Sequence, residues 1–141
     1  MFFKESLSVK KGFTLIEVLI VMVLMGLSIS IVIPNIARGY DKIKFRGEAK
    51  KFYELVQKIK FHAFYYQQNV TLSSPDRRLA VQGMALAADE IPDLPVDIKG
   101  EILFSSNGIS SGGEIYLYYK ETPKVVIRIE SFSGRTSREF L

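Results

Sequence analysis

The sequence predicts an α+β fold in which one long N-terminal helix packs against a small antiparallel β-sheet. Three patterns predict it: an apolar run near the N-terminus, a helical apolar stripe after it, and alternating strand patterns in the second half of the chain. The 141 residues amount to one domain, and 48% of them are hydrophobic and 24% charged, which is typical of a globular protein. The chain contains no cysteine, which excludes thiol catalysis, disulfides and cysteine-ligated zinc.

The first part of the helix is long and apolar enough to cross a membrane. Residues 13–33 contain a single ionisable side chain, Glu17, and a helix of this length spans roughly 31 Å, close to the ~30 Å hydrocarbon core of a bilayer. A secretory signal has a shorter apolar stretch followed by a small-residue cleavage site. We therefore expect a transmembrane helix over residues 13–36.

Basic side chains are concentrated in the segment that follows the apolar run. Residues 38–61 carry a net charge of +5, whereas residues 62–141 carry −2. Because the residues before the run are also net positive, the distribution of Lys and Arg leaves the orientation of the membrane helix open.

The helix is expected to continue beyond the membrane as an amphipathic arm, over residues 37–68. Pro34 lacks a backbone N–H, so a kink or a loosened turn is expected just before it. The apolar positions of the arm recur in alternating steps of four and three residues, which places them on one helical stripe: Phe45, Ala49, Phe52, Val56, Ile59, Ala63 and Tyr66. Asn69 and the turn residues 73–75 are expected to end the helical region.

Residues 69–141 are expected to form a β-rich globular domain. Strands are predicted at residues 70–73, 78–82, 98–104, 114–120 and 124–131, from β-branched and aromatic residues and from alternation of apolar and polar side chains. Residues 83–90 are ambiguous between a loop and a helical turn. The segments 105–113 and 121–123 are expected to connect strands. The apolar face of the sheet would then cover the stripe of the arm.

The junction Lys10-Lys11-Gly12-Phe13-Thr14-Leu15-Ile16-Glu17 resembles the prepilin-peptidase signature of type IV pilins and type II secretion pseudopilins. With the apolar run and Pro34, the resemblance covers roughly the first third of the chain, and it implies the pilin fold. It implies that residues 1–12 are a leader, that prepilin peptidase cuts between Gly12 and Phe13, and that the new Phe13 amine is methylated.

The same resemblance implies where the protein lies and what it binds. The leader would stay in the cytoplasm, the helix in the inner membrane and the globular domain in the periplasm. The implied partners are membrane lipid, prepilin peptidase, an inner-membrane assembly platform, and other pilins or pseudopilins that pack through the N-terminal helix.

Glu17 is the candidate assembly residue, together with Pro34, which falls where the family usually has a helix-breaking proline. A carboxylate inside a membrane helix costs at least ~2.5 kcal/mol unless it is paired, and the new amine of Phe13 is an available cation. In the family, this glutamate is thought to meet the N-terminal amine of a neighbouring subunit. The alternative, in which Glu17 reaches the membrane interface one turn away, stays open.

The second half of the chain resembles the GspH/FimT group of minor pseudopilins and minor pilins. The resemblance rests on Ile102-Leu103-Phe104, Asn107-Gly108, Ser111-Gly112-Gly113 and Ser133-Gly134-Arg135. It implies a minor pseudopilin, a structural subunit of the type II secretion pseudopilus, which serves protein export. The alternatives are a minor pilin of a type IV pilus, serving adhesion, motility or DNA uptake, and a membrane-anchored binding domain that does not polymerise.

The sequence argues against nucleic acid as a partner. Some FimT-type minor pilins hold DNA with a Gly-Arg-x-Arg motif, but in this chain two residues separate Arg135 from Arg138. In an extended strand that spacing points the two side chains to opposite faces.

The residue types also argue against catalysis and metal binding. His62 is the single histidine and lies in a run of aromatic residues, where packing is the expected role. Four acidic residues lie around two prolines without the glycine-centred spacing of a calcium loop: Asp89, Glu90, Asp93 and Asp97. We expect no cofactor, no metal and no enzymatic activity.

Overall fold

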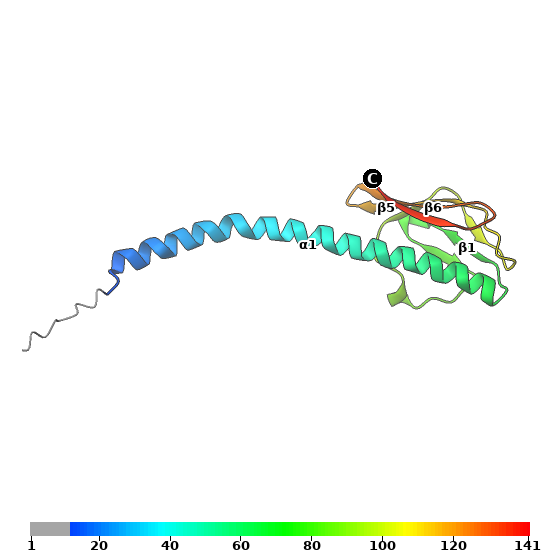
Figure 1. The fold of residues 1–141 in the computed structure, drawn as a ribbon, viewed down its shortest axis with the longest axis horizontal. Helices are drawn as coiled ribbons and strands as arrows, with labels where there is room; N and C mark the ends of the chain where they lie inside the picture. Colours follow the sequence, from blue (N-terminus) through cyan, green and yellow to red (C-terminus); the bar gives the residue numbers. More distant parts are fainter. Residues whose placement is uncertain (1–11) are drawn as a thin grey trace, which may run out of the picture. The chain divides into compact units, whose positions relative to one another are not determined.

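The computed structural model describes residues 12–141, except for the side chains of Asn35 and Ala37. It confirms the α+β class: helix α1 (Leu15–Tyr65) precedes a set of antiparallel strands, as Figure 1 shows. The chain divides into two compact units, Met1–Asp41 and Lys42–Leu141. Each unit is described by itself below, and the leader expected at residues 1–12 lies, apart from Gly12, outside the described residues.

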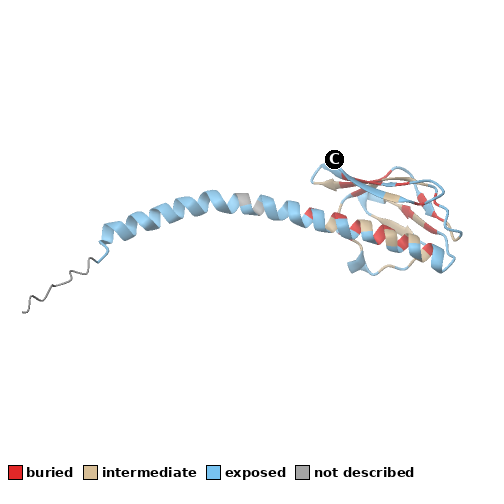
Figure 2. Cartoon of the chain, viewed as in Figure 1, coloured by how far each residue is buried: buried red, intermediate tan, exposed pale blue. Residues whose placement is uncertain are grey.

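In the second unit, α1 buries one side, and that side is the predicted stripe. The buried helical residues are Phe45, Ala49, Phe52, Leu55, Val56, Ile59 and Ala63, and Figure 2 shows them in red along the side of the helix that faces the strands. The prediction for Tyr66 was wrong. Its side chain is exposed, because α1 ends at Tyr65 and Gln67 then adopts a left-handed φ of 52°.

The strands form two antiparallel sheets instead of one. The three-stranded sheet has the order β2-β1-β4, formed by Ala80–Gln82, Val70–Ser73 and Ile102–Phe104. The four-stranded sheet has the order β3-β5-β6-β7, formed by Val96–Ile98, Gly113–Tyr119, Thr122–Ile129 and Thr136–Phe140. Two short 3-10 turns, Pro75–Arg77 and Ala88–Glu90, lie in the connections.

One hydrophobic core joins the helix to both sheets. The helical stripe packs with alternate residues of the strands, among them Leu72 of β1 and Ile115 and Leu117 of β5, which are fully buried. The ring of Phe45 lies 5.2 Å from that of Tyr119, measured between centroids. Burial of one large apolar side chain stabilises a fold by about 1.5–3 kcal/mol. Because many such side chains are buried together, the second unit has a substantial core of its own.

The strand predicted at residues 98–104 is in fact two strands that belong to different sheets. β3 ends at Ile98 and β4 begins at Ile102. Gly100 lies between them with a φ of +90°, a conformation that glycine adopts at little cost. The chain therefore turns at Gly100 and crosses from one sheet to the other.

The end of the chain differs from the prediction in two places. β6 begins at Thr122, so Pro123, expected in the hairpin connection, lies within a strand, opposite a register shift between Leu117 and Tyr118. The last strand, β7, was not predicted at all. It pairs with β6 along the edge of the sheet, where its residues are mostly exposed and carry no alternating apolar pattern.

Candidate functional site

The N-terminal end of α1 is fixed by Thr14. The backbone N–H of Glu17 donates a hydrogen bond to the Thr14 side-chain hydroxyl (3.3 Å) and lies 3.1 Å from the Thr14 carbonyl oxygen, which also accepts from the Val18 N–H (3.2 Å). A threonine with a glutamate three residues later is the sequence pattern of a helix N-cap. Sequence reasoning missed this role of Thr14, although Thr14-Leu15-Ile16-Glu17 contains the signal.

Glu17 lies in the first turn of the helix, beside the expected cleavage point. Glu17 lines an open hollow together with Gly12, Phe13 and Thr14. The unpaired N–H groups of a first turn carry a partial positive charge, which favours a carboxylate there by about 0.3–1 kcal/mol at an exposed site. Cleavage after Gly12 would place a new amine in the same hollow as this carboxylate.

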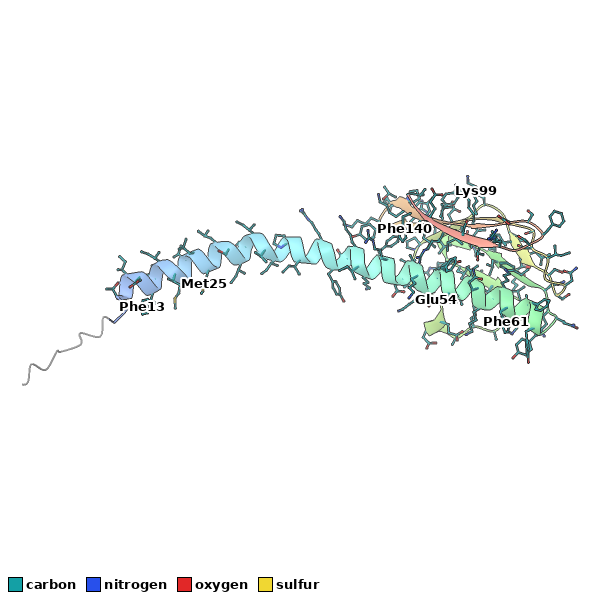
Figure 3. The ribbon with its side chains drawn as sticks, in the orientation of Figure 1. Phe13, Met25, Glu54, Phe61, Lys99 and Phe140 are labelled. Carbon is teal, nitrogen blue, oxygen red and sulfur yellow. The ribbon has the colours of Figure 1, made fainter. Side chains whose placement is uncertain are left out.

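The apolar half of α1 is exposed on all sides in the single chain. Every large hydrophobic residue from Leu15 to Ile33 is exposed, as Figure 2 shows in pale blue. Phe13 and Met25, which Figure 3 labels, are 81% and 61% exposed. By length and composition α1 can cross a membrane, and none of its apolar window is buried. This exposure distinguishes it from the core helix of a soluble protein.

The hydroxyl groups in this apolar half are satisfied within the helix. Ser28 donates to the carbonyl of Leu24 (2.8 Å), and Ser30 donates to the carbonyl of Gly26 (3.0 Å). Such bonds to the preceding turn lower the cost of a hydroxyl in lipid. Among described residues 13–33, Glu17 is the one ionisable side chain, and its burial in lipid would require a partner from outside the helix.

Pro34 lies inside α1, which continues through it without an interruption. Because proline donates no hydrogen bond, one bond of the helical ladder is absent at this position. The region is therefore a point of lower local stability within an intact helix.

The two C-terminal arginines do not share one location. Arg135 precedes β7, and its backbone closes the turn after β6, with its N–H bonded to the Ser133 hydroxyl (3.1 Å). Arg138 lies within β7, where its guanidinium group is 5.6 Å from the centroid of the Tyr53 ring and 5.3 Å from that of Phe140. This geometry gives Arg138 a packing role against aromatic side chains.

Two of the remaining polar candidates, His62 and Glu90, lie against other side chains. The His62 ring lies 4.5 Å from that of Tyr66, and its buried Nδ1 atom has no hydrogen-bond partner. Lys58 pairs with Glu90 at 2.6 Å, and the resulting hydrogen bond holds the pKa of Glu90 below its ordinary value. No group of three His, Cys, Asp or Glu side chains suited to a metal ion occurs among the residues that the structure describes.

One comparison with known proteins bears on the N-terminal region. A family profile described as the prokaryotic N-terminal methylation motif matches residues 7–33, a segment that includes Gly12, Phe13 and Glu17. The match supports a relationship to type IV pilin-like proteins, which carry this prepilin signal, and it covers under a fifth of the chain. Searches of curated proteins and of solved structures gave no significant match.

Proposed function

We propose that this chain is a minor pseudopilin, a structural subunit of the type II secretion pseudopilus. The second half of the chain resembles the GspH/FimT group, which agrees with this role. The observation that carries the proposal is the methylation motif at residues 7–33, which overlaps a helix whose apolar half is not covered by any part of the chain that the structure describes. Such a helix is insoluble alone and needs lipid or other helices around it.

The proposed life of the subunit has two stages. In the first, residues 13–36 lie in the inner membrane, with the leader 1–12 in the cytoplasm and residues 69–141 in the periplasm. Prepilin peptidase then cuts between Gly12 and Phe13, and the Phe13 amine is methylated. In the second stage the assembly platform moves the subunit into a filament, where neighbouring helices replace lipid around the apolar half.

In this proposal Glu17 sets the position of each subunit in the filament. Its carboxylate accepts hydrogen bonds from the Phe13 amine of a neighbouring subunit, which neutralises both charges in an apolar surrounding. Pro34 contributes a helix turn that lacks one hydrogen bond and can loosen during packing. The Thr14 hydroxyl accepts a hydrogen bond from the Glu17 backbone N–H, but the pairing itself depends on the charge of the Glu17 carboxylate.

The first test is the mass of the mature chain. A chain that begins at N-methyl-Phe13 agrees with the proposal, whereas retention of Met1–Gly12 would leave a membrane-anchored domain that does not polymerise. A deletion strain then separates the two filament systems. Loss of protein export with normal piliation supports the pseudopilin, and loss of piliation with normal export would replace it with a minor type IV pilin.

A pair of variants tests the role of the carboxylate. Glu17→Gln keeps the size of the side chain but removes its charge, so incorporation into filaments should fall by at least about tenfold, equivalent to about 1.4 kcal/mol. Thr14→Val removes the cap hydroxyl and leaves the charge, so incorporation should change little. Equal losses in the two variants would mean that Glu17 acts only through the start of the helix.

A further inference from the structure

A basic hollow lies at the beginning of the second unit. It has a volume of about 270 Å³ and is formed by the first turns of α1 in that unit, by the β5–β6 hairpin and by the end of β7. Its basic residues are Lys42, Arg46 and Lys124, and its aromatic residues are Phe45, Tyr119 and Phe140. Figure 3 labels Phe140 on the last strand.

The three cations of the hollow have no acidic partner among the described residues. No acidic side chain is among the hollow's lining residues, and the two glutamates nearest in sequence to its strands are engaged elsewhere. Glu121 pairs with Arg77 at 3.3 Å and Glu139 with Arg128 at 2.9 Å. The remaining lining residue is Leu141, whose backbone N–H donates to the Lys124 carbonyl (2.8 Å). The three basic side chains thus form no ion pair within the described part of the chain, and an anion would be attracted to them.

Two further cations lie over the aromatic walls of the hollow. The Lys120 ammonium group is 5.5 Å from the centroid of the Tyr119 ring, and the Arg138 guanidinium group is 5.3 Å from that of Phe140. The hollow thus combines apolar ring surface with positive charge. A ligand that suits it has an anionic group attached to an apolar body.

The position of the hollow in the chain favours a lipid over other anions. Lys42 is six residues after Ile36, the last exposed large hydrophobic residue before the basic segment, and six residues reach at most about 22 Å even when fully extended. The hollow is tethered at this short distance to a segment suited to a bilayer. Aromatic and basic side chains are also the types found at membrane interfaces.

We propose that this hollow binds the headgroup phosphate of an anionic phospholipid. Lys42, Arg46 and Lys124 contact the phosphate, and the glycerol and first acyl carbons lie against Phe45, Tyr119 and Phe140. The bound lipid holds the globular unit at the membrane surface while the apolar half of α1 is inserted. The binding requires insertion of the helix but neither leader cleavage nor polymerisation, so it is tested separately from the proposed function.

Native mass spectrometry of the full chain in detergent tests the proposal directly. Phosphatidylglycerol and phosphatidylcholine with identical acyl chains are added separately, and the retained lipid is counted. Each base near an anionic lipid contributes about a fivefold gain in binding, so retention of phosphatidylglycerol should exceed that of phosphatidylcholine by at least about tenfold. Equal retention of the two lipids would overturn the proposal.

A matched pair of triple variants separates a built site from general positive charge. Lys42→Gln, Arg46→Gln and Lys124→Gln together should abolish the preference for phosphatidylglycerol. The control carries Lys44→Gln, Lys50→Gln and Lys99→Gln, which remove the same charge from residues that do not line the hollow, and it should keep the preference. Circular dichroism checks that both variants are folded, and an equal loss in the two would contradict the assignment.

Competition distinguishes the sources of the anion. Inorganic phosphate and a short DNA duplex are each added at the same phosphate concentration as the lipid, and neither should displace it. Displacement by inorganic phosphate would show a site for a free anion, and displacement by DNA would show a nucleic-acid site. Either result would overturn the assignment to phospholipid.

Discussion

The two halves of α1 belong to one helix but differ completely in how their apolar side chains are covered. From Leu15 to Ile33 the large hydrophobic residues are between 43% and 85% exposed, whereas the stripe from Phe45 to Ala63 is at most 8% exposed. The stripe occupies one side of the helix, so two small sheets can bury it. The first half is apolar on every side, and none of the described residues cover it. Lipid or other helices are the surroundings that suit such a surface.

The largest effect is expected when the two regions are separated. A chain that begins at Lys42 should fold cooperatively and remain monomeric in water, because the core of the second unit comes from residues after Lys42. The full chain should remain in the membrane fraction after a high-salt wash. Fractionation and thermal unfolding by circular dichroism measure both properties. Failure of the shorter chain to fold would contradict the division into two units.

Truncating one apolar side chain in each region sharpens the comparison. Phe52→Ala removes a fully buried ring and should lower the free energy of unfolding of the second unit by about 3–5 kcal/mol. Leu24→Ala removes an exposed side chain of the first half and should leave that free energy unchanged. Urea unfolding of both full-length variants in detergent, followed by tyrosine near-UV signals, makes the measurement. A large effect of Leu24→Ala would mean that the halves are not independent.

Two glycines show how tightly the second unit packs its backbone. Gly83 and Gly100 both have a φ near +90°, but a Cβ atom at Gly83 would lie 2.2 Å from the Asn69 carbonyl oxygen, whereas one at Gly100 would meet nothing within 4 Å. Alanine at either position should cost about 1–2 kcal/mol for the left-handed backbone. At Gly83 the clash should add about 1–3 kcal/mol. Equal unfolding free energies for the two alanine variants would contradict the packing described around β1.

The smallest effect is expected from pH. The Tyr116 hydroxyl (2.6 Å) and the Arg128 guanidinium (3.0 Å) hold the pKa of Glu114 below its ordinary value. The folded state therefore prefers the ionised carboxylate. This contribution to stability is present above the unfolded-state pKa of about 4.3 and is lost as the pH falls through the lower folded-state pKa.

Glu114→Gln should remove that part of the acid sensitivity. Unfolding of the second unit, measured between pH 7 and pH 3, should depend less on pH in this variant than in the parent protein. Glu54→Gln is the matched control, because it leaves the contacts of Tyr116 and Arg128 intact. A Glu114→Gln variant with an unchanged pH dependence would show that the contacts of Glu114 contribute nothing to stability.

The helix and strands that could be predicted are those whose own residues carry the pattern of apolar and polar side chains. The helical stripe has a period of its own, and β5 alternates in burial, so these predictions were confirmed. In β6, Val125, Ile127 and Ile129 are buried as an alternating pattern requires, but Val126 is buried as well, so the alternation fails there. Leu55 was missed because it lies beside the stripe, three residues after Phe52 and four before Ile59, and it is buried in the same core.

The features that could not be predicted depend on partners far away in the sequence. β7 is a strand because the edge of β6 accepts it, and its own residues, Thr136–Phe140, lack a strand pattern. The split between β3 and β4 depends on which sheet each half joins, which the run from residue 98 to 104 does not encode. In the candidate site, Thr14 as a helix cap could have been read from local spacing, whereas the partner of Glu17 could not.

Cross-linking between ¹⁵N-labelled and unlabelled chains tests most directly whether copies of this chain cover the apolar half of α1. Cells grown first in ¹⁵N medium and then in ¹⁴N medium, so that labelled and unlabelled chains share one membrane, are treated with a membrane-permeant carbodiimide, which joins a carboxylate to an amine in contact with it. We predict a peptide that links the Phe13 amine of one isotope to Glu17 of the other, and its loss in Glu17→Gln. A link found only within one isotope, or none at all in cells with active filaments, would contradict the account.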